Sequence, residues 1–242
     1  MTSHLDITVV VPCYNEEDNI QLLLDELETN LNATGKTFEI IYVDDASTDH
    51  SVEVLLSEQR KRPYLRVLRH KKNFGESAAI LSGYEAARGD VIFSMDADLQ
   101  NDPADIPHFL KALSSADAVC GVRARREDSW TKRISSRIAN FVRAALLKDS
   151  IHDAGCTYRA IKREALSQLI GFRGLHRFIP TILGYHGFKV VEIVVNHRPR
   201  TRGYSKYGIG NRLWVGILDI IGMLWYRRRF FPPHRWEELR KE

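Results

Sequence analysis

Two carboxylates and one amide lie at alternate positions directly after an apolar segment. Residues 90–94 have the composition of a buried strand, and Asp96, Asp98 and Gln100 follow them. In an extended chain, residues two apart project from the same face, so these three side chains should point the same way. Their oxygen atoms suit Mg²⁺ or Mn²⁺. The stretch predicts a cation site and phosphate-ester chemistry, and the alternative is an Asp-rich turn.

Polar residues also follow two other apolar segments. Pro12, Tyr14 and Glu16 come at or after the end of residues 7–11, and Asp44 begins a polar run after residues 38–43. The carboxyl ends of parallel strands meet at one edge of an α/β sheet, where ligands bind. Tyr14 could stack on a base, Asp44 could accept hydrogen bonds from it, and Glu16 could hold a ribose hydroxyl. The alternative for residues 44–49 is a turn and helix cap.

These residues need a sheet that brings the segment ends together. Apolar segments at residues 7–11, 38–43, 65–68 and 91–94 alternate with helical patterns at 19–31, 51–60 and 76–87. This alternation predicts an α/β fold with a doubly wound, mainly parallel sheet flanked by helices. Further along, we expect helices at 103–113, 130–147 and 211–226, and strands near 118–122, 157–161 and 190–195.

Composition narrows the class of protein. The chain has 242 residues, 44% of them hydrophobic and 27% charged, as in ordinary globular proteins. Its formal net charge is +4, with basic residues concentrated in 123–143 and 198–229. This asymmetry suggests surfaces that face anions such as phosphates or lipid headgroups, and the alternative for each run is a solvated charged face. Three cysteines without metal-ligand spacing suit a reducing cytosol. No signal peptide and no membrane-spanning apolar run is visible.

Several enzyme classes lack their sequence signatures here. The chain has no Gly-x-Gly-x-x-Gly after its first apolar segment and no Walker A sequence, which argues against a dinucleotide dehydrogenase or a P-loop hydrolase. Its nine histidines show no zinc-site spacing. The basic segments lack the interleaved aromatic residues of a nucleic-acid-binding motif, so we expect no nucleic-acid partner.

The ordered set of motifs resembles the family 2 inverting glycosyltransferases of the GT-A fold. The set comprises residues 11–16, 43–49, 73–75, 95–100 and 121–123. The subgroup that it resembles is the dolichyl- or undecaprenyl-phosphate sugar synthases, such as dolichol-phosphate mannose synthase. The resemblance spans residues 7–226 and implies transfer of a hexose from GDP-mannose or a UDP-hexose to polyprenyl phosphate, with inversion and with Mg²⁺ or Mn²⁺.

The resemblance also assigns roles to the strand-end residues. Pro12, Tyr14, Glu16 and Asp44 match the family's nucleotide pocket. Asp98 and Gln100 match its metal ligands, and Asp98 therefore counts among the catalytic residues. Asp96 matches the first Asp of the Asp-x-Asp motif, where it touches either the metal or the donor's ribose.

Acceptor-side roles come from later residues. Residues 152–159 and 200–206 are similar to two acceptor-side and phosphate-binding stretches of the subgroup. Arg200 and Lys206 match its phosphate-holding cations. Asp153 is the predicted orienting or activating carboxylate, with a structural partnership to Arg159 as the alternative. The acceptor-phosphate candidates are Arg123, Arg133 and Ser136.

The end of the chain departs from the family pattern. Many relatives carry transmembrane helices after the catalytic domain, whereas here residues 211–226 are amphipathic and precede Arg227-Arg228-Arg229. We predict a catalytic domain at 1–210 and an amphipathic, basic helix and tail at 211–242. The helix either lies in lipid headgroups or packs on the core. The first reading implies a peripheral enzyme on the cytoplasmic face of a membrane.

Two other functions remain open from the sequence. One is a family 2 enzyme that acts on a soluble or glycan acceptor, against which the 200–206 stretch argues. The other is a non-catalytic nucleotide-sugar-binding protein, against which the intact Asp96, Asp98 and Gln100 argue.

Overall fold

A seven-stranded sheet organises the part of the chain that the computed structural model describes, which is residues 4–123, 143–199 and 212–231. The strands are β1 (Leu5–Cys13), β2 (Phe38–Asp44), β3 (Leu65–Arg69), β4 (Gly89–Ser94), β5 (Ala118–Arg123), β6 (Arg159–Lys162) and β7 (Val190–Val195). The helices are α1 (Ile20–Ala33), α2 (Ser51–Lys61), α3 (Glu76–Ala86), α4 (Ile106–Leu113), α6 (Arg163–Leu166), α7 (Ile179–Tyr185) and α8 (Arg212–Arg229), with 3-10 turns η1 (Pro103–Asp105) and η2 (Leu175–Arg177).

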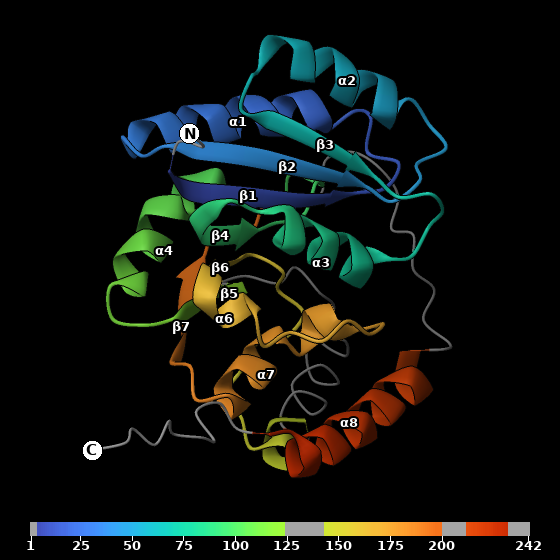
Figure 1. Ribbon diagram of the computed structural model, residues 1–242, viewed down its shortest axis with the longest axis vertical. Helices are drawn as coiled ribbons and strands as arrows, with labels where there is room; N and C mark the ends of the chain where they lie inside the picture. The colour runs from blue at the N-terminus through green and yellow to red at the C-terminus, as the bar shows by residue number, and fades with distance from the viewer. Residues whose placement is uncertain (1–3, 124–142, 200–211, 232–242) are drawn as a thin grey trace, which may run out of the picture.

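The strand order is β3-β2-β1-β4-β6-β5-β7, with β6 antiparallel to both of its neighbours and the other pairings parallel. The chain runs outward from β1 to β3 and then returns to the other side of β1 at β4. Strand order therefore reverses beside β1, which is where open α/β sheets bind ligands. The arrowheads of β1, β2 and β3 point to the same side in Figure 1. This arrangement confirms the predicted mainly parallel, doubly wound sheet.

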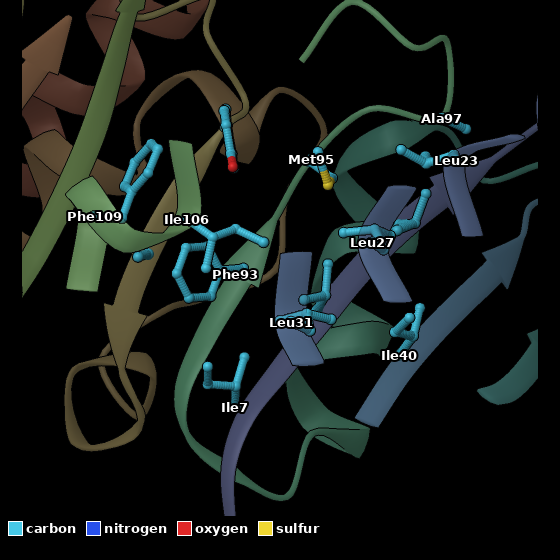
Figure 2. Close-up of a cluster of buried hydrophobic side chains, with 14 of the residues drawn as sticks. Ile7, Leu23, Leu27, Leu31, Ile40, Phe93, Met95, Ala97, Ile106 and Phe109 are labelled. Carbon is cyan, nitrogen blue, oxygen red and sulfur yellow. The ribbon is translucent and has the colours of Figure 1, made fainter. Parts of the chain in front are cut away.

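Helices cover both faces of the sheet, and each face has its own apolar core. One core joins α1, α2 and α4 to the sheet; Figure 2 shows Leu23, Leu27 and Leu31 of α1 packed near Phe93 and Ile40. Their spacing places them on one face of the helix, as the sequence predicts. The other core joins α3, α7 and α8 to the opposite face.

Helix α3 packs directly on β1 because Gly83 has no side chain at the contact. A Cβ atom at Gly83 would lie 2.2 Å from Cγ1 of Val10. Gly89, the first residue of β4, also lies close to the backbone of β1. A Cβ atom at Gly89 would lie 2.4 Å from the carbonyl carbon of Ile7. These two contacts hold β4 and α3 close to β1, and with them the residues that follow β4 and begin α3.

Some elements differ from the sequence-based expectations. The predicted helix at 103–113 divides into η1 and α4, since Asp102 caps the 3-10 turn by accepting a hydrogen bond from the Ala104 N–H at 3.0 Å. Helix α7 was not predicted, because its seven residues are almost all buried and give no periodic pattern. Most of the predicted helix at 130–147 lies outside the described residues, and its end at 143–147 is helical.

Helix α8 lies apart from the sheet and is the last described element of the chain (Figure 1). Its Met223 is buried in the second core, so the helix contacts the rest of the protein. Its outer side is apolar as well, with Leu218, Ile221 and Trp225 between 57% and 66% exposed. None of the helices in the described residues has the length and hydropathy needed to cross a membrane. The predicted division of the chain at residue 210 stays a prediction.

Candidate functional site at the carboxyl edge of the sheet

The loops after β1 and β2 are joined by hydrogen bonds into one surface. The Asn15 backbone N–H donates to Oγ of Ser47 at 2.9 Å, and Oδ1 of Asn15 accepts from the Thr48 N–H at 2.7 Å. The Glu16 N–H donates to Oγ of Ser51 at 2.9 Å. Tyr14 and Glu16 are therefore held beside the start of the Asp44 loop, as the parallel pairing of β1 with β2 requires.

The backbone adopts left-handed conformations at three strand ends. Asn15, Ala46 and Leu99 have φ values of 53°, 60° and 63°, and they follow β1, β2 and β4 respectively. Such conformations cost free energy for residues other than glycine and persist where surrounding contacts enforce them. Three such residues lie at one edge of the sheet. We infer that the surrounding contacts fix the backbone of these loops and so the directions of their side chains.

Asp44 is fully buried at the end of β2 and lies beside a cation that the sequence did not single out. Its Oδ2 is 3.4 Å from Nε of Arg69, the last residue of β3, whose side chain is 57% exposed. The Ser47 N–H also contacts both carboxylate oxygens at 3.3 Å. The Asp44 carboxylate is thus buried at this edge of the sheet, and the exposed Arg69 side chain lies beside it.

Asp45 ties the loop before α3 to this edge. Its carboxylate accepts hydrogen bonds from the N–H groups of Phe74 and Gly75 at 2.9 and 2.7 Å, and it lies 2.7 Å from Nδ1 of His70. Glu76, the first residue of α3, is placed next to the β4 end as a result. Neighbouring Asp residues at 44 and 45 give no sequence signal of which one faces the site and which one supports the loop.

The end of β4 carries the most crowded negative charge. Burial and the adjacent Asp98 carboxylate raise the pKa of Asp96 to about 6, against the opposing effects of Thr157, Arg123 and Arg159. Burial and Asp96 likewise raise the pKa of Glu76 to about 7. Three carboxyl groups from two elements therefore lie close enough to repel one another.

A divalent cation fits this donor set. Carboxylate and amide oxygens are hard ligands, and positive charge would relieve the mutual repulsion of Asp96, Asp98 and Glu76. Within the described ranges, no cluster of three His, Cys, Asp or Glu side chains has an arrangement ready to hold a metal alone. A site with few protein ligands suits Mg²⁺ in particular, because that ion usually keeps waters and substrate phosphates in its coordination shell.

Gln100 is fixed by the segment that follows β7. Its backbone carbonyl accepts from the Arg198 N–H at 2.9 Å, and its Nε2 donates to the Arg198 carbonyl at 3.3 Å. The amide nitrogen is thereby engaged, which leaves the amide oxygen as the atom that can face a cation. The Arg198 guanidinium in turn donates to Glu26 of α1 at 2.7 Å and to Asp102 at 2.7 Å.

Asp102 and Arg198 are supporting residues that the sequence analysis missed. Burial alone would raise the pKa of Asp102, but hydrogen bonds from Asn196 and Ala104 and the charge of Arg198 lower it overall. Both residues lie near assigned motifs, two positions from Gln100 and from Arg200. Their partners are far apart in the sequence, so only the folded chain shows what they join.

Asp153 pairs with Arg123 and not with Arg159. Its two carboxylate oxygens accept from Nη2 and Nε of Arg123 at 2.7 and 2.8 Å, and both side chains are largely buried. Gly155 leaves room for the pair, since a Cβ there would lie 3.2 Å from Nη2 of Arg123. Arg159 instead donates to the carbonyl groups of His176 and Ala154. The predicted alternative partner of Asp153 is thus wrong.

The described chain brings most of the predicted site residues to one edge of the sheet. These are Pro12, Tyr14, Glu16, Asp44, Asp96, Asp98 and Gln100. Beyond β4, Arg123 ends β5 and pairs with Asp153, which lies in the segment before β6. Arg133, Ser136, Arg200 and Lys206 lie outside the described residues.

A GT-A glycosyltransferase fold is the class that this sheet and edge define, and solved structures share it. Glucosyl-3-phosphoglycerate synthase from Mycobacterium tuberculosis, crystallised with phosphoglyceric acid, matches with a TM-score of 0.67 and 18% identity, over 92% of this chain and 80% of that one. A mannosyltransferase from Pyrobaculum calidifontis, in complex with GDP-Man and Mn²⁺, matches with a TM-score of 0.63 and 21% identity, over 96% and 67% of the two chains.

The chain belongs to glycosyl transferase family 2, whose family model matches residues 8–170. It is 37% identical over 217 residues to the undecaprenyl-phosphate 4-deoxy-4-formamido-L-arabinose transferase of Pseudomonas aeruginosa. The aligned region covers 89% of this chain and 64% of the relative. The enzyme of the same name from Edwardsiella ictaluri is 35% identical over 206 residues, with 84% and 63% covered. The chain thus spans slightly less than two thirds of the length of these relatives.

Proposed function

We propose that this chain transfers one sugar from a nucleoside diphosphate sugar to a polyprenyl phosphate, with inversion at the anomeric carbon. The carrying observation is the meeting of the Asp96–Gln100 stretch with the Tyr14 and Asp44 loops at the point where strand order reverses. The similarity to undecaprenyl-phosphate sugar transferases supports the lipid acceptor.

The donor would lie along the ends of β1, β2 and β4. Tyr14 and Pro12 would pack against the base, while Asp44 and Glu16 would accept hydrogen bonds from the base and ribose. Asp98 and the oxygen of Gln100 would hold Mg²⁺ or Mn²⁺ beside the diphosphate, with Asp96 touching the cation or the ribose. When bound, the cation would stabilise the charge that develops on the leaving nucleoside diphosphate.

The acceptor phosphate would lie on the side of β5. Arg123, together with Arg133 and Ser136, would bind it, and Arg200 and Lys206 would hold phosphate groups of the complex. The lipid phosphate oxygen is already ionised at neutral pH, so no strong general base is needed. Because both oxygens of Asp153 bind Arg123, we assign Asp153 the role of orienting Arg123 toward the acceptor.

Helix α8 would bring the enzyme to its lipid substrate as a peripheral protein at the cytoplasmic face. Leu218, Ile221 and Trp225 form an exposed stripe at helical spacing, and Arg228 and Arg229 lie exposed at the end of the same helix. An apolar stripe beside basic residues is typical of helices that lie in the headgroup layer of anionic membranes.

The central test is a panel of UDP- and GDP-sugars incubated with undecaprenyl phosphate and Mn²⁺, with products identified by mass. We expect a glycolipid that carries one sugar residue for at least one donor. Absence of glycolipid with every donor would contradict the proposal. Transfer that continues without polyprenyl phosphate would indicate a soluble acceptor, and donor binding without any transfer would indicate a non-catalytic binding protein.

A further inference from the structure

Glu76 and His176 form a polar pair beside the β4 end that the proposed function does not use. Glu76 begins α3 and His176 lies in η2, two elements that are far apart in the sequence. Oε2 of Glu76 is 3.9 Å from Nε2 of His176, and the two side chains are 27% and 21% exposed. They are therefore partly buried but reachable by a ligand.

The hydrogen bonds of Ser77 determine which nitrogen of His176 carries the proton. Oγ of Ser77 accepts from the Gly174 N–H at 3.0 Å and lies 2.7 Å from Nδ1 of His176. Because its oxygen already accepts from the Gly174 N–H, we assign the Ser77 hydroxyl as the donor to Nδ1. Burial and the charges of Arg159 and Arg177 lower the pKa of His176 to about 3, so the ring is neutral. Its proton is then on Nε2, facing Glu76.

The gap between the two groups is too long for a hydrogen bond and suits one inserted hydroxyl. An oxygen atom can lie about 2.8 Å from both Nε2 and Oε2 when these are 3.9 Å apart. Such a hydroxyl would accept from His176 and donate to Glu76, which uses both of its hydrogen-bonding functions. An amide N–H or a methyl group could not make both bonds.

The pair lies beside the expected cation site, within reach of the hexose of a donor bound there. Glu76 interacts electrostatically with Asp96 and Asp98, which places it next to the expected cation. In a nucleoside diphosphate sugar the hexose is joined to the second phosphate, so its hydroxyls lie within about one ring's width of the metal-bound diphosphate. Arg159 helps to fix the position of His176, since its Nη1 donates to the His176 carbonyl at 2.5 Å.

We propose that Glu76 and His176 bind one hydroxyl of the donor hexose between them and so select the sugar that is transferred. This inference rests on the proposed function and names the residues that recognise its donor. Sites that hydrogen-bond a substrate hydroxyl reject analogues lacking it, because their buried polar groups are then left unpaired.

The test separates recognition of the sugar from recognition of the diphosphate. The donor identified by the transfer panel and its free nucleoside diphosphate are titrated, with Mn²⁺, into wild type, Glu76→Ala and His176→Ala. We expect Glu76→Ala to weaken binding of the nucleotide-sugar about 10- to 100-fold more than binding of the nucleoside diphosphate, the range for a hydrogen bond to a charged group. His176→Ala, which removes a neutral donor, should weaken binding of the nucleotide-sugar about 2- to 10-fold and leave binding of the nucleoside diphosphate within about twofold of wild type. The matched control is Glu85→Ala, an exposed position on the same helix.

Mono-deoxy analogues of that donor identify the hydroxyl. For one analogue, the affinity for wild type should fall to about the affinity that the variants show for the full donor. The affinity of that analogue for the variants should be no lower than its affinity for wild type. The inference is overturned if the variants lose equal affinity for the nucleotide-sugar and for the free nucleoside diphosphate. It is also overturned if wild type and variants bind the deoxy analogues in the same order of affinity. Glu76→Gln, which keeps the side-chain shape, replaces Glu76→Ala if thermal unfolding shows a folding defect. Failure of the transfer panel itself would instead contradict the proposed function.

Discussion

At the scale of single residues, the described part of the chain gathers more negative than positive charge around the end of β4. Asp96, Asp98 and Glu76 lie close together, and Arg123 and Arg159 offset only part of their repulsion, so the pKa values of Asp96 and Glu76 are raised. Arg123 already has a carboxylate partner in Asp153. This imbalance is the physical reason to expect a cation here, beyond the presence of an Asp-x-Asp sequence.

Asp98 is the residue whose loss should damage the reaction most selectively. We expect Asp98→Ala to lower sugar transfer by about 100-fold or more, because it removes a ligand from the ion that stabilises the leaving group. Initial rates over a range of Mn²⁺ concentrations provide the measurement. Asp90→Ala is the control, since Asp90 lies at the other end of β4 and its side chain is 60% exposed. Full turnover by Asp98→Ala would disprove the metal assignment.

Asp153 should matter for stability as well as for transfer. Asp153→Ala leaves the largely buried Arg123 without its carboxylate, which costs about 3–5 kcal/mol of unfolding free energy. Chemical denaturation measures this, with the exposed Glu53→Ala as control. Removal of both partners in Arg123→Ala/Asp153→Ala should recover part of the loss. An Asp153→Ala variant as stable as wild type would show that the ion pair does not form in solution.

At the scale of elements, the site is assembled by contacts between segments distant in sequence. The loop before α3 is tied to β2 by Asp45, and the segment after β7 is tied to α1 and to the β4 loop by Arg198. Each tie is a buried or half-buried charged group with several hydrogen-bond partners. Loops held in this way keep their side chains within the tolerance that metal and phosphate chemistry require.

Arg198 should act on the metal through Gln100. Arg198→Ala keeps the backbone groups that bind Gln100 and removes the guanidinium that anchors that backbone to Glu26 and Asp102. We expect it to weaken binding of the Mn²⁺–nucleoside diphosphate complex by about 10-fold, because residues that orient metal ligands typically contribute 10- to 100-fold in affinity. Calorimetric titration with and without Mn²⁺ distinguishes this from a general loss of nucleotide binding. Arg60→Ala on the exposed side of α2 is the control. An unchanged affinity would mean that the Arg198 guanidinium is not needed to hold the backbone that binds Gln100.

Gly83 should be intolerant of even a methyl group. We expect Gly83→Ala to lower the unfolding free energy by about 1–3 kcal/mol, since its Cβ would lie 2.2 Å from Val10 and force α3 away from β1. Gly184→Ala on α7 is the matched control: nothing lies within 4 Å of its added Cβ, so it should be neutral or stabilising by up to about 1 kcal/mol. Thermal and urea unfolding test both. Equal effects of the two changes would contradict the packing argument.

At the scale of the whole molecule, α8 is linked to the sheet through η2. Arg177 of η2 donates to Asp219 of α8 at 2.6 Å, and the neighbouring His176 contacts Ser77 at the start of α3. The helix therefore packs on the protein through Met223 and Asp219, while its outer stripe stays exposed. The packed side agrees with the core-packing reading from the sequence, and contact of the exposed side with lipid headgroups stays a prediction.

The exposed stripe of α8 should govern membrane binding. We expect Ile221→Glu to weaken binding to vesicles of anionic lipid by about 10-fold or more, because burial of one such side chain in an apolar environment is worth about 1.5–3 kcal/mol. Co-sedimentation measures it, and binding should fall as salt screens the basic end of the helix. Leu56→Glu introduces the same charge at an exposed apolar position on α2 as the control. Equal binding by Ile221→Glu and wild type would show that another surface contacts lipid.

The sequence could predict the parts of the fold that have a periodic local signal. The apolar runs of β1, β2 and β4 and the helical spacing of α1 follow from which side chains must be buried. Helix α7 was missed because it is buried on nearly all sides. The alternative reading of Asp153, a structural pair with Arg159, was wrong because Arg159 is nearer in sequence, whereas the residue that pairs with Asp153 is Arg123.

By itself, the sequence determined the chemistry that this protein can offer: oxygen ligands after β4, polar residues after β1 and β2, and a parallel sheet to bring them to one edge. Local order in the chain carries this information, since strands and the residues that end them are adjacent in sequence. The tertiary structure alone decided the pairings that need distant segments to meet: Asp153 with Arg123, Gln100 with Arg198, and Glu76 with His176. Hydrogen bonds and ion pairs depend on distances in space, which only the packed fold defines.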